Sequence, residues 1–460
     1  MSSLLGCLSS AARSLNAQSM GLAVVGQNIA NVNTPNYARR LVDFGAVPPL
    51  ESWSAGGGVE VLGIRSARDL LVEARLGQEL SYESAQSALA DGLSEVVGAF
   101  GAAGSSVDGA LTAFFDAFAN LAGDPTALSA RQAVLSEASS LAATFHDLAG
   151  RLTESRADAD VRVTAAVEQV NGLATRLAEV NQAMATAGAA DSPQRLQYRD
   201  EQLGLIENLS QLLQVQTVAR EDGGFDVTFG SGRALVVGGI AVPLDTTRAA
   251  DGTARLASQG VDVTAEISGG ELGGVVSLRD QVIPGYLARL DTLAFSVATE
   301  VNALHGAGFD LSGGTGLALF SVGAAAGGAA AAIGVNPALA GQPRLIAAAG
   351  SPSPGDNSTA RAIAALRSSR VLDAGTATFT EAFGSLVHQV GQDAATASDR
   401  RDSASEVARE IRNLREAVSG VSLDEEAALM LRFQRAYEAN ARYFQTVEAA
   451  LDVLMQMVAR

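Results

Sequence analysis

The chain has 460 residues, a length that allows about three domains. Its 50 acidic residues outnumber the 32 basic ones and give a net charge of −18, which argues against a nucleic-acid partner. Every basic residue is Arg. The absence of Lys excludes the phosphate-loop, kinase and Schiff-base chemistries that need a lysine amine.

Chemically reactive side chains are few and far apart. The three histidines (His146, His305 and His388) and the single cysteine, Cys7, form no zinc-binding spacing and no disulfide framework. We therefore expect no catalytic residue, no cofactor and no metal site. We interpret His305 as structural, and the stretch 356–358, which could suggest a cation loop, as a turn that starts a helix.

Targeting signals are also missing from the sequence. No apolar run is long enough to cross a membrane, and the first residues lack the basic and apolar regions of a cleavable signal peptide. We expect no membrane insertion. The chain should remain in the cytoplasm or leave by a route that reads no cleaved signal.

The first predicted element is a helix over residues 3–31. Leu8, Leu15, Leu22 and Ile29 recur every seven residues and, with Leu4, Ala11 and Val25 at the offset positions, mark an apolar stripe along it. The helix should stop at Asn33 and Thr34, because Pro35 disfavours the helical conformation of the residue before it. A core helix of an ordinary domain would carry the same stripe.

The next 150 residues predict long helices. Residues 34–64 are irregular or β, and helices follow over 65–100 and 109–122, with a break over 101–109. The stretch 126–187 has no proline and predicts a helix about 90 Å long at 1.5 Å per residue. A turn over 188–193 should then return the chain into a helix over 194–213, giving a long antiparallel pair.

The pattern changes between residues 214 and 283. Valine, threonine and glycine dominate there, and Phe225, Val227 and Phe229 alternate with polar residues, which predicts an antiparallel β module. Helices are expected again over 284–305, 358–372 and 379–420. The Gly/Ala-rich stretch 306–355 should be mostly loop, with a short strand near 333–335.

The last helix has the clearest pattern. Ser422 and Glu425 predict a capping box at its start. Two interleaved heptad series then follow, Met430, Tyr437, Phe444 and Leu451, and Phe433, Asn440, Val447 and Leu454. We expect a coiled-coil seam in which Asn440 fixes the register. A helix packed by its end on a globular core is the alternative.

Both ends of the chain therefore carry apolar stripes that need cover. They should pair with each other, with copies in neighbouring subunits, or with both, and an isolated helical hairpin of this kind could become ordered only on assembly. This predicts a polymerising subunit or a partner-binding helix.

Several motifs resemble those of the bacterial flagellar rod, hook and hook-associated proteins. The run A-N-V-N-T-P-N-Y at 30–37 resembles their ANxxTPGY signature, with Asn36 in place of the usual glycine; Asn tolerates positive φ, so the turn should survive. The segments 421–428 and 433–442 resemble the closing helix of the hook-associated members. The GGELGG run at 269–274, Arg279-Asp280 and His305 resemble their central block.

The resemblance implies a structural subunit at the junction of hook and filament. Such proteins are made in the cytoplasm and secreted by the flagellar type III system. Their partners are copies of themselves, hook protein, a filament-side hook-associated protein, and an export chaperone on the C-terminal helix. The implied interface comprises the stripe residues at both ends together with Asn33, Thr34, Pro35 and Tyr37.

We thus expect a mainly α fold with a β insertion, built from a terminal coiled-coil pair, a long antiparallel helix bundle and a small antiparallel β domain. The predicted domains are 1–64 (joined by 421–460), 65–213, 214–283, 284–420 with the loop 306–355, and 421–460. Another flagellar axial protein (hook or distal rod) and a secreted coiled-coil effector or adhesin are the alternatives. An enzyme fits the sequence least.

Overall fold

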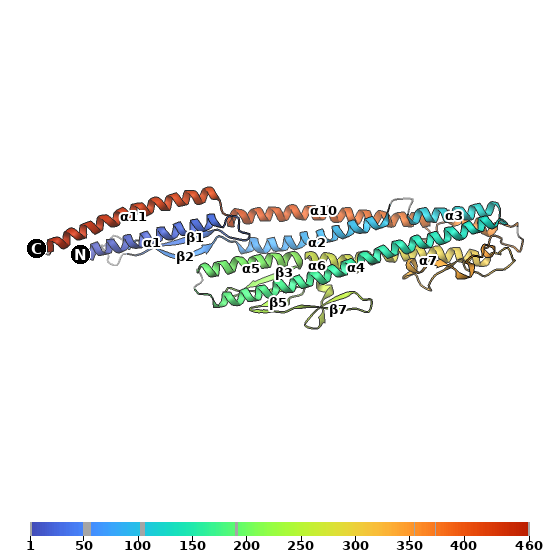
Figure 1. Ribbon diagram of the computed structural model, residues 1–460, viewed down its shortest axis with the longest axis horizontal. Coiled ribbons are helices and arrows are strands. Elements are labelled where there is room, and N and C mark those ends of the chain that lie inside the picture. The colour runs from blue at the N-terminus through green and yellow to red at the C-terminus, as the bar shows by residue number, and fades with distance from the viewer. Residues whose placement is uncertain are drawn as a thin grey trace.

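The computed structural model describes residues 2–48, 57–101, 106–188, 192–353, 355–372 and 374–458. The molecule is a long, narrow assembly of helices, and the two ends of the chain lie together at one tip (Figure 1). Small antiparallel sheets accompany the helices. The predicted class, mainly α with a β insertion and several domains, is confirmed.

The tip is formed by both ends of the chain. Helix α1 (Ser2–Ala30) packs along α11 (Leu423–Val458), as Figure 1 shows. The antiparallel hairpin of β1 (Arg40–Ala46) and β2 (Val59–Ser66) lies against α1. We call α1, α11 and this hairpin the terminal rod.

Long helices form the rest of the length, which we call the body. They are α2 (Leu70–Phe100), α3 (Val107–Gly123), α4 (Leu128–Thr186), α5 (Pro193–Leu212) and α10 (Phe379–Ser419). Helix α2 packs along α10, and α4 packs against both α3 and α5. With 59 residues, α4 extends roughly 90 Å at 1.5 Å per residue, as predicted.

Capping residues explain where two body helices begin. Helix α2 starts at Leu70, five residues later than predicted, because β2 continues to Ser66 and Asp69 caps the helix. Thr378 and Glu381 form a full capping box at the start of α10. The predicted break over 101–109 and the predicted turn over 188–193 lie partly outside the described residues.

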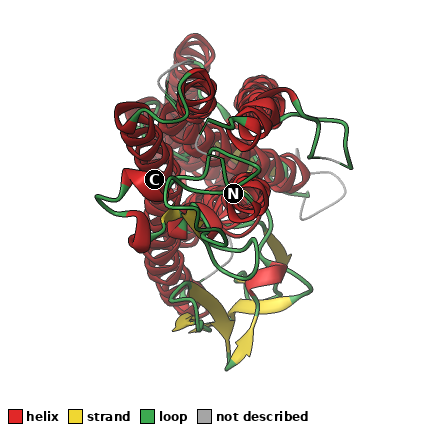
Figure 2. Cartoon of the chain, turned by 90° about the vertical axis from the view of Figure 1, so that its right-hand side faces the viewer, coloured by secondary structure: helices red, strands yellow, loops and turns green. Residues whose placement is uncertain are grey.

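Two small sheets lie beside α4 and form what we call the β module. A four-stranded sheet has the order β3-β4-β5-β6, and a three-stranded sheet has the order β7-β8-β9. Figure 2, a view along the molecule, shows these strands at one edge of the helices. The strands are β3 (Val215–Ala219), β4 (Phe225–Phe229), β5 (Arg233–Val237), β6 (Ile240–Ala241), β7 (Leu244–Arg248), β8 (Ala254–Ser258) and β9 (Val261–Asp262).

The prediction that the β module extends to residue 283 is wrong. Its last strand ends at Asp262, and a single 3-10 turn, η1 (Thr264–Glu266), follows. Helix α6 (Gly270–Ser277), a π-helical turn (Leu278–Val282) and α7 (Ile283–Ala307) then form one continuous helical stretch. The glycines at 269 and 270 both have positive φ and start this helix instead of closing a hairpin.

The π turn has a physical cause in Pro284. A proline inside a helix cannot donate a backbone hydrogen bond, and its ring clashes with the carbonyl four residues earlier. Widening the preceding turn relieves both problems. Pro284, the predicted start of this helix, therefore lies inside the helical stretch.

The remaining stretch is mostly loop, as predicted. Its short elements are β10 (Phe320–Ser321), α8 (Ala329–Ala332), β11 (Gly334–Val335), η3 (Pro337–Leu339), η4 (Pro343–Leu345), α9 (Ser358–Ala365) and η5 (Leu366–Ser368). Strand β11 confirms the predicted strand near 333–335. One continuous apolar core, drawn from residues between Ala88 and Ala397, runs through the body and the β module, and neither α1 nor α11 contributes to it.

Candidate assembly interface

The turn after α1 reverses the chain into β1. The Thr34 amide donates to the Asn31 carbonyl (2.9 Å), and the Tyr37 amide donates to the Thr34 carbonyl (3.2 Å). Asn36 has a φ of 59°, the left-handed conformation expected from its place in the motif. Asn33, Thr34 and Pro35 are exposed, whereas Tyr37 is half-buried.

Asn28, a buried residue on α1, holds this turn in place. Its Oδ1 accepts from the Arg40 amide (2.8 Å) and the Tyr37 hydroxyl (2.9 Å). Its Nδ2 donates to the Arg40 carbonyl (3.0 Å) and to Glu426 (3.0 Å). The Asn28 amide thus uses its full bonding capacity to join α1, β1 and α11.

Glu426, in the first turn of α11, is completely buried. Its carboxylate accepts from Arg39 Nε (2.7 Å) as well as from Asn28. The neighbouring Glu425 pairs with the same arginine (2.7 Å). The predicted capping box is only half formed, because the Glu425 carboxylate is turned to Arg39, while the Glu425 amide donates to Ser422 Oγ at 3.5 Å.

A second set of ion pairs joins the turn to the body. Asp200 on α5 accepts from both Arg40 and Arg68, and Arg68 also pairs with Glu73 on α2 (2.6 Å). Burial raises the pKa of Tyr37 to about 12, so its hydroxyl stays protonated and keeps donating. Asn28, the two carboxylates and these arginines form a polar joint between terminal rod and body, which we call the collar (Asn28, Arg39, Arg40, Arg68, Asp200 and Glu426).

The predicted stripe on α1 is only partly covered. Leu8, Leu15, Leu22 and Ile29 are all of intermediate exposure. The fully buried positions are smaller residues, of which Ala11 and Val25 belong to the predicted stripe; they are Ala11, Ala17, Gly21, Val24 and Val25. Small residues let α11 come close: a Cβ added to Gly21 would lie 2.9 Å from the Phe433 ring.

The seam on α11 is also covered unevenly. Phe433 and Val447 are buried, and the Phe433 ring lies 6.0 Å from that of Phe44 on β1. Tyr437 and Leu454 are exposed, whereas the remaining seam positions are of intermediate exposure, namely Met430, Asn440, Phe444 and Leu451. Asn440 donates to the Ala436 carbonyl of its own helix (2.9 Å), and among the described residues no hydrogen bond joins its side chain to α1.

Large apolar side chains are exposed elsewhere on the same rod. More than half of the surface of each of these residues is exposed: Leu5, Leu423, Leu431, Val453, Met455 and Met457. The rod therefore covers part of its seam and leaves several large apolar side chains open to solvent.

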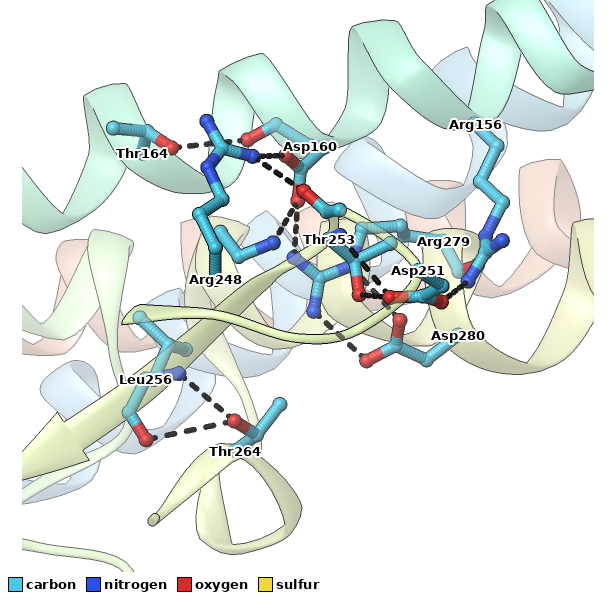
Figure 3. Close-up of polar contacts among 12 residues, drawn as sticks. Arg156, Asp160, Thr164, Arg248, Asp251, Thr253, Leu256, Thr264, Arg279 and Asp280 are labelled. Carbon is cyan, nitrogen blue, oxygen red and sulfur yellow. Dashed lines mark hydrogen bonds and ion pairs between the residues drawn. The ribbon is translucent and has the colours of Figure 1, made fainter. Parts of the chain in front are cut away.

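A buried arginine anchors the β module to the body (Figure 3). Arg279, in the π turn, is fully buried and pairs with Asp160 of α4 (2.7 Å) and with Asp280 (2.8 Å). Asp160 also pairs with Arg248 of β7 (2.6 Å) and accepts from the Ala254 amide of β8 (2.8 Å). These bonds lower the pKa of the Asp160 carboxyl against the opposing effect of burial.

His305 forms hydrogen bonds with two parts of the loop that follows α7. Its Nε2 lies 3.0 Å from the amide nitrogen of Ala347 and must accept that proton, so Nδ1 carries the ring proton and donates to the Leu317 carbonyl (2.7 Å). Asp356 accepts from the amides of Ser358 and Gly350, which is the helix-start turn predicted there. Both residues thus have structural partners.

No group of metal-ligating side chains occurs among the described residues. None of the described helices combines the length and apolarity needed to span a bilayer. Sequence reasoning missed most of the collar. Of the collar residues, only Glu426 lies in a segment that resembles a family motif. Hydrophobic periodicity reveals apolar stripes, but it gives no sign of a buried charge whose partner, Arg39, is 387 residues away in the sequence.

Family comparisons agree with this architecture, beginning at the two ends of the chain. Residues 8–37 match the flagella basal body rod protein family, and residues 416–457 match the C-terminal family of the flagellar basal body rod FlgEFG proteins. These two segments cover most of α1, the turn and α11. The terminal rod is therefore of the kind found in flagellar axial proteins.

Comparisons that cover the body identify a more specific group within the flagellar axial proteins. Residues 93–320 match the helical domain of flagellar hook-associated protein FlgK. The chain is 24% identical to flagellar hook-associated protein 1 of Escherichia coli (99% of this chain and 100% of that protein) and 24% identical to that of Bacillus subtilis (97% and 96%). The similarity to flagellar hook-associated protein 1 thus runs along almost the whole chain, and the protein is a structural protein of the bacterial flagellum.

A solved structure has the same fold. The flagellar hook junction protein FlgK from Burkholderia pseudomallei superposes with a TM-score of 0.69 at 17% identity, covering 75% of this chain and 100% of that chain. The predicted resemblance to hook-associated proteins is confirmed.

Proposed function

We propose that this chain forms part of the junction between flagellar hook and filament and assembles there through its terminal rod. The observation that carries the proposal is the apolar surface left open on that rod. Leu431, Val453 and Met455 are each more than half exposed, on a helix that already covers another seam. Exposed apolar patches of this kind mark surfaces that bind other proteins.

In the tubular assembly of subunits that we infer, the terminal rods lie innermost. Each rod packs against rods of neighbouring copies, so the partly covered stripe of α1 (Leu8, Leu15, Leu22 and Ile29) and the seam of α11 bury further area on assembly. The body forms the next layer, and the β module faces outward. Contacts between different faces of identical subunits repeat along a ring or helix.

The same surface accounts for the partners we propose. Hook protein lies on one side of the ring and a filament-side hook-associated protein on the other. Before assembly, an export chaperone covers α11 in the cytoplasm, because Met455 and Met457 would otherwise face water. The chain is then secreted by the flagellar type III system. It acts mechanically and is not an enzyme.

Gene deletion followed by microscopy tests this function. The deletion should leave hooks without filaments, with filament protein lost to the medium. Return of the full chain should restore filaments, and a chain lacking residues 2–31 and 421–460 should not. Filament growth with the truncated chain would overturn the proposal, and normal hook-to-filament growth in the deletion strain would do the same.

Hydrogen exchange tests a narrower point, namely that the rod gains lasting order only on assembly. Amides of α1 and α11 in the free chain should exchange much faster than those of α4, because the rod lies outside the main core. Strong protection over residues 3–31 and 425–458 in the free chain would contradict this expectation.

A further inference from the structure

A cavity of about 650 Å³ lies where the terminal rod meets the body. Four arginines line it: Arg65 from β2, Arg68 from the segment before α2, and Arg195 and Arg199 from α5. We call this cavity the arginine notch. Asp43 is its only acidic lining residue, and Asp43 pairs with Arg65 (3.0 Å).

Two of the other arginines in the notch, Arg195 and Arg199, have no carboxylate partner among the described residues. Arg195 donates to backbone carbonyls, including those of Met184 and Asp222 (both 3.0 Å), and forms no ion pair within the described residues. Arg199 stacks its guanidinium 4.7 Å from the Phe225 ring centre. Arg68 has two carboxylate partners outside the notch.

Two buried N–H groups of the notch have no hydrogen-bond acceptor in the part of the chain that the structure describes. They are Arg68 Nε and Arg199 Nη1. Burial and the neighbouring charges of Arg195 and Arg68 lower the pKa of Arg199. Like charges gathered around unsatisfied donors are unfavourable unless an anion enters, since a buried N–H without a partner is expensive. Among the described residues, the positive charge of Arg195 and Arg199 is therefore left without a carboxylate partner.

The rim of the notch is apolar, and so is the segment that fits it. Leu62 and Leu70 line the notch and are half-exposed or more. The start of α11 combines an exposed apolar residue, Leu423, with exposed carboxylates at Asp424 and Glu425. Glu425 is already paired with Arg39, which leaves Asp424 to enter.

The two surfaces lie at the same level of the molecule. In Figure 1, the start of α11 is at the upper edge, whereas the end of β2 and the start of α5 lie below it at the same distance from the tip. A copy placed beside this one, without a shift along its length, would present its α11 start to the notch. Such contacts join different faces and therefore continue around a ring.

We infer that the arginine notch receives Asp424 and Leu423 of a second copy of this chain. The inference rests on the proposed function, since it specifies one lateral contact of the assembled ring. Its chemistry is a charge-assisted hydrogen bond from the guanidinium groups to the Asp424 carboxylate, with Leu423 packing on the apolar rim.

Cysteine cross-linking in intact flagella tests the contact. Cys7→Ser removes the native thiol, and Leu62→Cys with Leu423→Cys places one cysteine on each surface at exposed positions. Oxidation should give a ladder of linked chains. The control pair, Leu62→Cys with Val261→Cys of the β module, should give none. Filaments that grow without a ladder from the first pair would overturn the inference and leave the proposed function standing.

Charge exchange provides a second measurement. Asp424→Arg should lower the amount of chain recovered in purified hook–filament particles by at least about tenfold, because it places like charges face to face. Arg199→Glu alone should do the same, and the double variant should recover most of the loss. Wild-type incorporation of both single variants would overturn the inference, as would a double variant that recovers nothing while each purified chain keeps its normal unfolding transition.

Discussion

The terminal rod and the body are both made of long helices, but the helices of the body are buried against their neighbours far more completely than those of the rod. Each body helix packs against two or more neighbours and shares one continuous core. Helix α11 buries only Glu426, Phe433 and Val447 among its described residues. The body is therefore complete within one chain, whereas the rod has the surface of a subunit that awaits others. The predictions below probe this contrast through the stability of the free chain, from the largest effect to the smallest.

The largest loss should come from the buried pairs of the body. Arg279→Ala removes a fully buried guanidinium group, so Asp280 loses its ion-pair partner and Asp160 keeps only the exposed Arg248 and the Ala254 amide. We expect the free energy of unfolding to fall by about 3–5 kcal/mol. Urea denaturation followed by circular dichroism measures this.

Arg248→Ala is the matched control, because Arg248 pairs with the same Asp160 but is 66% exposed. Its loss should be about 1 kcal/mol or less. If both substitutions lowered the free energy of unfolding equally, burial would not determine the strength of the ion pairs of Asp160. The difference in stability inferred between the body and the rod would then have no support.

A smaller loss is expected at the collar. Glu426→Ala leaves Arg39 and the Asn28 amide each without one partner, which should cost about 2–3 kcal/mol. The effect should be local: amides of α11 should exchange faster, while those of α4 should be unchanged. Glu425→Ala, which removes the exposed partner of the same arginine, is the control, and it should leave exchange in α11 nearly unaltered.

The collar also marks the limit of what the sequence could predict. Heptad spacing predicted α1, α11 and the positions buried at Phe433 and Val447, because apolar period is a local property of the chain. On α1 it found Ala11 and Val25, which are buried, but it centred the stripe on larger residues such as Leu8 and Leu15, which are only partly covered. Which of two adjacent faces is buried depends on the partner helix, and a single sequence does not give that.

Two further errors have the same origin. Glycine pairs and β-branched residues after Asp262 predicted more strand, yet contacts with α2 and α4 favour a helix over 270–277. The pairing of Arg39 with Glu426, and of Arg279 with Asp160, joins residues far apart along the chain. Such pairs become visible only once the helices are placed side by side.

Mild acid should weaken the body before the rod, through His305. Burial lowers the pKa of this imidazole below its ordinary 6.5, and its neutral form accepts from Ala347. The unfolded chain gains its proton near pH 6.5 and the folded chain only at lower pH, so this contribution is complete above pH 6.5 and declines as the pH falls below it. His305→Gln should flatten the dependence of the melting temperature on pH in that range, whereas His146→Gln, at an exposed position, should not.

The smallest effect on the free chain should accompany the largest effect on assembly. Tyr437 belongs to the predicted seam but is 41% exposed, so Tyr437→Asp should change the free energy of unfolding by about 0.5 kcal/mol or less. The same change puts a charge on the open surface of the rod and should abolish incorporation into flagella, as should Leu451→Asp. Glu438→Asp, on the next exposed residue, controls for the position. Normal filaments from the Tyr437→Asp chain would mean that the exposed part of the predicted seam is not an interface, since a surface that must be buried against a neighbour does not tolerate an unpaired carboxylate.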